Sequence, residues 1–311
     1  MLSRVADSVY WMSRYFERAD HCARVLDATY NLMLNPSKPT TDQRWQRITA
    51  RLGLGNETMD LDPQTAMVRL LCDVTNRSSI VSCIASAREN ASQVREQISS
   101  EMWEKLNQLY HEVTHAAASM ERDAEPLRLF AVIREGSYQF NGVTDATMNH
   151  GEAWQFVQFG KYMERGCALP ALLDAVFSLA SGADDLDWVG LLASCSAFEA
   201  YCKVYTADLK PERVAEFLLL HSEFPYTVRY AIEQMHAALD SIARMVSVRK
   251  AGQMERIVGR LRSSLAYAQI DDIISRDFHR FLNSIIEQCH SLHVAAHELY
   301  IEYPIESAFE A

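Results

Sequence analysis

An 18-residue segment occurs twice in this chain, and both copies carry the same pair of adjacent charged residues. The first copy begins at position 11 and reads WMSRYFERADHCARVLDA; the second begins at position 158 and reads QFGKYMERGCALPALLDA. Glu17 and Arg18 thus recur as Glu164 and Arg165, 147 residues later. Because each copy of an internal repeat usually marks one structural unit, the repeat predicts a chain built from two related halves.

Apolar residues around the first copy are spaced alternately three and four positions apart, which places them on one face of a long amphipathic helix. This helix should end near Pro36. The second copy keeps the apolar spacing except at Pro170, which lacks an amide hydrogen and is expected to kink the helix or end its first half. The apolar positions of the first copy are Val9, Met12, Phe16, Ala19, Ala23, Leu26, Tyr30 and Met33.

The remainder of the chain also has the pattern of helices. Only 11 Gly and 8 Pro interrupt it, and no stretch sustains an alternation of apolar and polar residues. A break is expected from Phe140 to Asp145, and Pro225 suits the first turn of a helix. We therefore predict an all-α helical bundle, a single domain over 1–311 with approximate halves 1–141 and 142–311. Further helices are expected at about 42–53, 64–75, 77–98, 100–120, 124–140, 186–207, 211–221, 224–248, 254–268 and 270–300.

Composition narrows the class of protein and partner. The net charge is −11, which argues against nucleic acid or an anionic membrane as a partner, since both require concentrated Lys and Arg. No stretch approaches the ~18 apolar residues of a membrane span, and the N-terminal residues lack the apolar run of a secretory signal. Seven cysteines without a CxxC pair are typical of reduced thiols, so we expect a cytoplasmic protein. No nucleotide-binding or hydrolase motif is recognisable, and no cofactor is expected.

The repeated charges form a polar stripe beside the apolar face of the helix. Neighbours in a helix point about 100° apart, so each glutamate is expected to contact an arginine of the other copy. Two interpretations stay open: ion pairs that lock two helices in register, or a carboxylate–guanidinium cluster in a cleft that binds a polar ligand or partner. The candidate residues are Arg14, Glu17, Arg18, Arg24, Asp27, Glu164, Arg165 and Asp174.

A metal site is a third interpretation of the same glutamates. Glu-x-x-His occurs three times on predicted helices, and two such motifs with two further glutamates make up the ligand set of di-iron carboxylate bundles. The spacing arises easily by chance in a helical chain, and the arginine beside each repeated glutamate disfavours a nearby dication. The ligand set of this alternative would be Glu17, Glu164, Glu112, His115, Glu287 and His290.

The opening stretch MLSRVADSVYWMSRYFERAD resembles the bacterial alpha-E family, a predicted helical domain named for its Glu-Arg motif. The segments SSIVSCIASARENASQVREQISSEMWEKLNQLY and GVTDATMNHGEAWQFVQFGKYMERG are similar to the same family, and the resemblance covers nearly the whole chain. The chain departs from the family pattern at Gly166 and Cys167 after the second Glu-Arg pair, at Ser13 and at His150.

The resemblance implies a function in partnership with another protein. Genes of this family tend to lie beside, or to be fused to, an ATP-grasp protein, and often lie beside a transglutaminase-like cysteine peptidase. The implied role is an accessory or substrate-presenting partner of an ATP-grasp amide or peptide ligase in bacterial peptide synthesis or modification. Two alternatives remain: an enzyme that uses Glu17, Arg18, Glu164 and Arg165, and the di-metal bundle.

Overall fold

The computed structural model describes residues 1, 3–34, 41–55, 61–123, 126–178, 183–246 and 252–301. These residues form helices and no strands, which confirms the all-α class. None of the helices in these ranges is both long and apolar enough to cross a membrane. The helices are α1 (Ser3–Met33), α2 (Thr41–Thr49), the π-helical turn η1 (Ala50–Leu54), α3 (Pro63–Leu71), α4 (Ile80–Ser92), α5 (Ser100–Asp123), α6 (Leu127–Thr147), α7 (Glu152–Phe177), α8 (Asp185–Ser194), α9 (Phe198–Tyr205), α10 (Pro211–Leu220), α11 (Val228–Val246), α12 (Gly252–Ala266), α13 (Ile270–Arg276) and α14 (Phe278–Tyr300).

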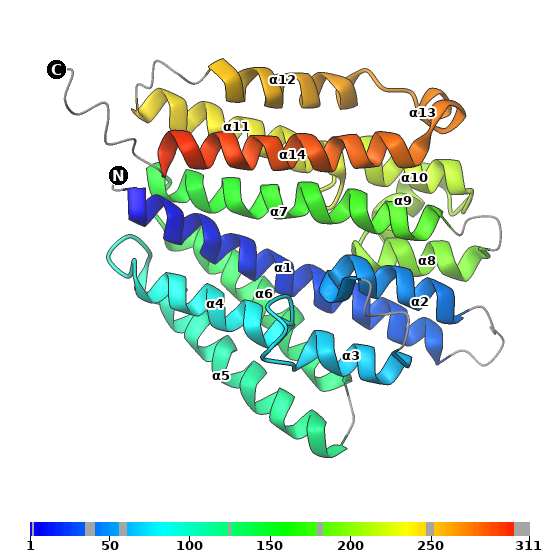
Figure 1. The fold of residues 1–311 in the computed structure, drawn as a ribbon, viewed down its shortest axis with the longest axis horizontal. Helices are drawn as coiled ribbons and strands as arrows, with labels where there is room; N and C mark the ends of the chain where they lie inside the picture. Colours follow the sequence, from blue (N-terminus) through cyan, green and yellow to red (C-terminus); the bar gives the residue numbers. More distant parts are fainter. Residues whose placement is uncertain are drawn as a thin grey trace.

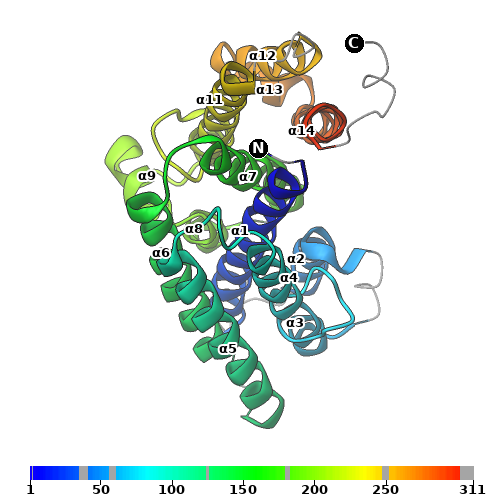
Figure 2. The same cartoon turned by 90° about the vertical axis from the view of Figure 1, so that its left-hand side faces the viewer.

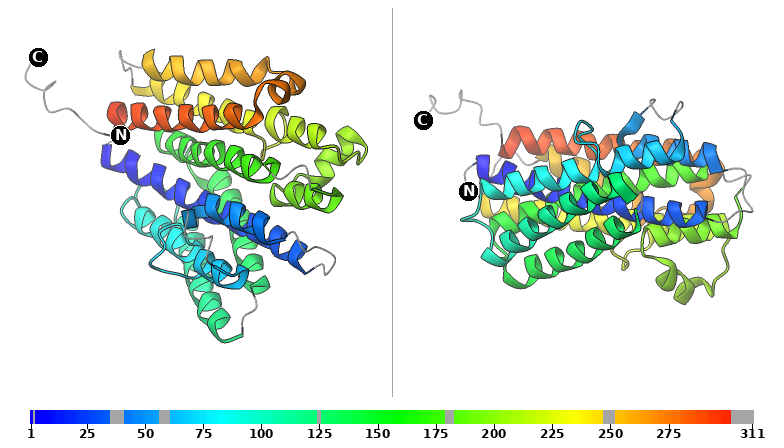
Figure 3. Two further views of the ribbon diagram at one scale, coloured as in Figure 1. Left: turned by 45° about the vertical axis from the view of Figure 1, so that its right-hand side comes forward. Right: turned by 90° about the horizontal axis from the view of Figure 1, so that it is seen from below.

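The two helices that contain the repeated segment, α1 and α7, pack against each other at the centre of the molecule (Figures 1 and 2). Helices α4, α6 and α8 pack on α1, whereas α11, α14 and α2 pack on α7. Helix α12 lies at one end of this stack and α5 at the other (Figures 1 and 3). The repeated charged residues therefore lie at the central interface.

Helices α1 and α7 run parallel and in register. The amino group of Met1 contacts Glu152 at 2.8 Å near the start of both helices, and Tyr10 lies against Gly160 further along. A Cβ atom at Gly160 would overlap the Tyr10 carbonyl oxygen and Ser13 Oγ. The absence of a side chain at this position thus lets the two backbones approach closely.

The helices around α1 and α7 follow one another in a matching order. Helix α4 packs on α5 and α5 on α6; likewise α11 packs on α12 and α12 on α14. A duplicated chain would produce this order of contacts, so it supports the predicted halves, which remain a prediction.

Two of the expected helices are each divided in two. The stretch expected as 186–207 forms α8 and α9, because Ser196 between them has a φ of 49°, outside the right-handed helical region. The stretch expected as 270–300 forms α13 and α14, and the Asp277 side chain accepts a hydrogen bond from the Arg280 amide at 2.9 Å to cap the second helix. Local propensity did not indicate either boundary.

The expected break from Phe140 to Asp145 is wrong, because α6 continues through it to Thr147. The Asn141 side chain donates to the Ser137 carbonyl at 2.9 Å and accepts from Lys161 Nζ at 2.7 Å, so tertiary contact holds this residue in the helix. The expectation for Pro225 is also wrong. Helix α11 begins three residues later, where Thr227 Oγ1 accepts a hydrogen bond from the Tyr230 amide.

Pro170 does not end α7, which runs without interruption from Glu152 to Phe177. Proline removes the hydrogen bond to the carbonyl four residues earlier, here that of Gly166. The thiol of Cys289 on α14 donates to this carbonyl oxygen, with a Sγ–O distance of 3.8 Å. A side chain of the neighbouring helix thus provides a partner that the backbone lacks.

Candidate functional site

The two Glu-Arg pairs exchange partners across the α1–α7 interface, as helix geometry predicts. Arg165 Nε donates to Glu17 Oε1 at 2.6 Å, and Arg18 Nε donates to Glu164 Oε1 at 2.6 Å. Glu17, Glu164 and Arg165 are buried, whereas Arg18 is partly exposed. Each carboxylate therefore has a guanidinium partner on the opposite helix, which satisfies a charge that would be costly to bury alone.

Glu164 is held by two arginines of α1. Arg14 Nε donates to its Oε2 at 2.8 Å, and Arg18 donates to both oxygens, the second through Nη2 at 3.0 Å. Burial by itself would raise the pKa of Glu164, but the two guanidinium groups outweigh it and hold the pKa at about 2. Glu164 is therefore ionised at neutral pH and fixed in position by three charge-assisted hydrogen bonds.

The pairing around Glu17 differs, because the repeat position of Arg14 is occupied by Lys161. Lys161 Nζ donates to Asn141 Oδ1, and burial, together with the charge of Arg165, lowers its pKa to about 8. Lys161 and Glu17 line a cavity of about 170 Å³ between α1, α6 and α7. Sequence comparison of the two copies alone does not reveal this cavity, since it depends on where α6 packs.

Arg24, the fourth candidate on α1, pairs within its own helix. Its Nε donates to Asp20 Oδ2 at 2.8 Å, and the hydroxyl of Tyr226 donates to the same oxygen at 2.5 Å. The Tyr226 ring also lies 3.8 Å from the Arg165 guanidinium carbon and 4.8 Å from that of Arg24. This buried cluster joins α1 and α7 to the segment before α11. The second copy has Cys167 and Ala171 at the positions equivalent to Asp20 and Arg24.

The repeated aspartates do not join the Glu-Arg cluster. Asp27 accepts a hydrogen bond from the exposed Arg134 of α6 at 3.2 Å. Asp174 instead contacts Arg51 of η1, and His279 Nδ1 of α14 at 2.5 Å. Each aspartate thus ties a different neighbouring helix to the central pair.

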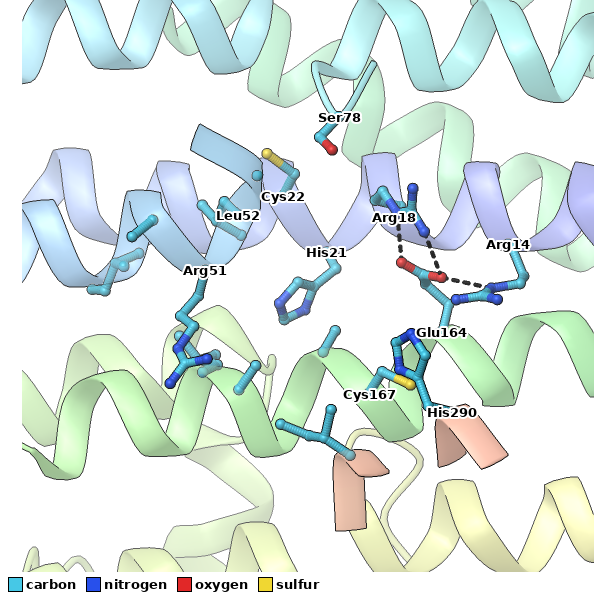
Figure 4. A pocket seen from close by; sticks show the side chains of 17 residues that line it. Arg14, Arg18, His21, Cys22, Arg51, Leu52, Ser78, Glu164, Cys167 and His290 are labelled. Carbon is cyan, nitrogen blue, oxygen red and sulfur yellow. Dashed lines mark hydrogen bonds and ion pairs between the residues drawn. The ribbon is translucent and has the colours of Figure 1, made fainter. Parts of the chain in front are cut away.

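A cavity of about 400 Å³ opens beside Glu164, between α1, η1, α7 and α14 (Figure 4). Its apolar wall includes Ile48, Leu52, Leu172 and Ile286. The turn at Gly53, whose φ of 120° favours glycine, places η1 against Ser78 at the edge of the cavity. The polar and charged residues of the lining are Arg14, Arg18, His21, Arg51, Ser78, Glu164 and His290, with the thiols of Cys22 and Cys167.

His21 is the most informative residue of this lining. Its side chain is buried, with 7% exposed, and its ring points into the space between α1 and α7 (Figure 4). No residue in the described part of the chain forms a hydrogen bond with it. Burial lowers the pKa of His21, which favours the neutral imidazole with one donor and one acceptor nitrogen. No sequence pattern singles out His21, although it lies one turn after Glu17; the second copy has Ala168 there.

The di-metal alternative is wrong for the residues that the structure describes. Glu112 and His115 are exposed on α5, which packs on α4 and α6 rather than on α7. Within the described ranges no three His, Cys, Asp or Glu side chains are grouped so as to hold a metal ion. The metal site would need a four-helix geometry that brings together Glu17, Glu164, Glu112, His115, Glu287 and His290. That geometry is not formed, and arginines are hydrogen-bonded to both repeated glutamates.

The other histidines of α14 have partners elsewhere. His293 Nδ1 lies 2.8 Å from the Tyr10 hydroxyl, which also accepts a hydrogen bond from Arg14 Nη1 at 3.2 Å. Burial and the charge of Arg14 lower the pKa of His293 to about 4. His293 is therefore neutral at pH 7 and extends the hydrogen-bonded network of Glu164 toward the N-terminal end of α1.

Comparison with known proteins identifies the family. Residues 1–301 match the Alpha-E model, described as a predicted alpha-helical domain with a conserved ER motif. Similar proteins include Uncharacterized protein Rv2567 of Mycobacterium tuberculosis and Uncharacterized protein Mb2597 of Mycobacterium bovis, each 26% identical over 263 residues. The match covers 77% of this chain but only 30% of the length of each relative. No solved structure matches the chain. The match over almost the full length, together with two Glu-Arg pairs at the centre of an all-α fold, shows that the chain belongs to the Alpha-E family.

Proposed function

We propose that this protein is a cytoplasmic, substrate-presenting partner of an ATP-grasp-type amide or peptide ligase in a bacterial peptide synthesis or modification system. The observation that carries the proposal is the cavity beside Glu164, which is lined by three arginines and this buried carboxylate. The choice of a ligase as the partner rests on the family resemblance, which also makes a transglutaminase-like peptidase a second candidate partner.

The protonation state of Glu164 favours binding over acid–base catalysis. A general base works best when its pKa lies near the pH at which the enzyme operates. Glu164 has a pKa of about 2 and all three of its hydrogen bonds come from guanidinium groups. Such a carboxylate is a weak base, and its role is to hold Arg14 and Arg18 in fixed positions at the cavity wall.

The lengths of the relatives support a role beside another polypeptide. The matched region makes up 30% of each mycobacterial protein, so in those chains it is joined to a much longer remainder. A domain that is part of a longer polypeptide in its relatives can act together with a neighbouring domain.

Purification of the protein together with the ATP-grasp protein of the neighbouring gene tests this proposal. We expect the two proteins to form a complex that survives size-exclusion chromatography at micromolar concentration. Two well-folded proteins that show no association under these conditions would contradict the proposal. An enzyme that acts alone would behave differently: Glu17→Gln or Glu164→Gln would abolish a turnover measured on the isolated chain while stability changed little.

A further inference from the structure

The charged side chains around the cavity beside Glu164 carry one more positive than negative charge. Arg14, Arg18 and Arg51 face it, while Glu164 and Asp174 are the carboxylates that bind these three guanidinium groups. Both carboxylates are buried. Three cations against two anions favour a ligand with a single negative charge over a dianion such as phosphate.

The volume and the apolar wall of the cavity indicate the size and the apolar character of the rest of the ligand. Its volume of about 400 Å³ lies in the range of small-molecule sites. Ile48 and Leu52 from one side, and Leu172 and Ile286 from the other, provide a surface for an apolar body. The combination suits an amphipathic monoanion, with a carboxylate at one end and an aliphatic group at the other.

His21 adds an independent indication of a ligand. A histidine nitrogen that faces a cavity can form a hydrogen bond with a molecule bound there. The ring of His21 is buried, has no partner among the described residues and points into the cavity (Figure 4). A ligand amide or carboxylate in the cavity would provide this hydrogen bond.

We propose that this cavity binds the free C-terminal carboxylate of a short apolar peptide. Arg51 would receive the carboxylate, His21 would bond to the peptide backbone, and the aliphatic side chain would lie on the apolar wall. The inference deepens the proposed function and rests on it for the role of the peptide, which becomes the acyl or amine substrate that the partner ligase receives.

Calorimetric titration of the full chain, without any partner, tests the inference. The probe is N-acetyl-leucyl-leucine, with the same peptide carrying a C-terminal amide as its matched control. Loss of one charge-assisted hydrogen bond corresponds to about a tenfold to hundredfold change in affinity. We therefore expect the free acid to bind at least about tenfold more tightly than the amide. Equal binding of acid and amide, no binding at millimolar peptide, or tighter binding of inorganic phosphate would each overturn the inference.

Two substitutions test whether binding of the free acid depends on the cavity or on surface arginines in general. Arg51→Gln should weaken binding of the free acid about tenfold, whereas Arg134→Gln should leave it unchanged. The two arginines are a matched pair: both bind an aspartate, and their side chains are 46% and 48% exposed. Equal losses from both substitutions would refute the site.

A variant that fills the cavity keeps the test valid if Arg51→Gln disturbs folding. Ala171→Leu places a larger side chain on the cavity wall within α7 without changing any charge. It should abolish binding of the free acid, and unchanged binding in a folded Ala171→Leu protein would refute the site. Complex formation with the ligase is measured separately, so a complex without peptide binding defeats only this inference, and peptide binding without a complex defeats only the proposed function.

Discussion

Glu164→Gln removes one buried negative charge from the centre of the α1–α7 interface while keeping the shape of the side chain. The pKa of Glu164 is about 2, against an ordinary value of 4.5. At 1.36 kcal/mol per pKa unit, this difference corresponds to roughly 3 kcal/mol of stabilisation at neutral pH. Removing one partner of a buried ion pair typically costs about 3–5 kcal/mol, so the two lines of reasoning agree.

The expected change in melting temperature follows from the size of the chain. With an unfolding entropy of about 2.1 cal/mol/K per residue, a loss of roughly 3 kcal/mol lowers the Tm of this protein by about 5 °C. Urea unfolding at pH 7 measures the free energy directly. The matched control is Glu233→Gln, which removes a carboxylate bonded to Arg229 on the surface of α11 at 3.0 Å. That partly exposed pair should contribute less than about 1 kcal/mol.

The pH dependence distinguishes a charge effect from a packing effect. The pKa of Glu164 is lower in the folded state than in the unfolded state, so its stabilisation is complete above about pH 5 and is lost as the pH falls toward 2. The difference between wild type and Glu164→Gln should therefore shrink to less than half by about pH 3. A difference that stays constant with pH, or a loss below about 1 kcal/mol at pH 7, would refute the assignment of this stability to the ion pairs.

Substitutions at Gly160, Lys161 and Cys289 test other contacts. Gly160→Ala should destabilise the protein because a Cβ would overlap the Tyr10 carbonyl; Gly142→Ala in α6, where a Cβ meets nothing within 4 Å, should stabilise it by up to about 1 kcal/mol. Thermal unfolding of both variants should show opposite signs, and a shared sign would contradict the close backbone approach. The pKa of Lys161 is lower when folded than when unfolded, so its burial destabilises the wild type below about pH 8, and this penalty fades as the pH rises toward 10.5. Lys161→Met should therefore gain stability over wild type at pH 7 and lose that advantage by pH 10, as measured by urea unfolding at both values. Cys289→Ala should cost about 1 kcal/mol or more from the lost bond to Gly166, and Cys289→Ser, which keeps a donor, should lose less.

Much of the central interface could be predicted before any coordinates, because it depends on local geometry. The spacing of apolar residues predicts α1 and α7, since side-chain positions on a helix follow from its 3.6-residue period. The same period separates Glu17 from Arg18 by about 100°, and the repeat makes an exchange of partners with Arg165 and Glu164 the natural pairing. The structure confirms both ion pairs.

The errors concern features that no local pattern encodes. The Glu-x-x-His spacing is local, but a metal site also needs the right helices to face one another, and α5 lies away from α7. Asp27 and Asp174 occupy equivalent repeat positions yet contact different helices, because η1 and α14 reach only the second. Pro170 remains in a continuous helix because a thiol from α14 replaces its missing backbone contact.

The sequence by itself determined the helical class, the family and the two Glu-Arg pairs that join α1 to α7. These follow from short-range periodicity and from similarity along the chain. Only the tertiary structure decided that Arg51, His21 and Glu164 share one cavity, because these residues come from η1, α1 and α7 and their proximity arises from packing of distant segments. Binding depends on where such side chains converge in space, so the site could be found only after the fold was known.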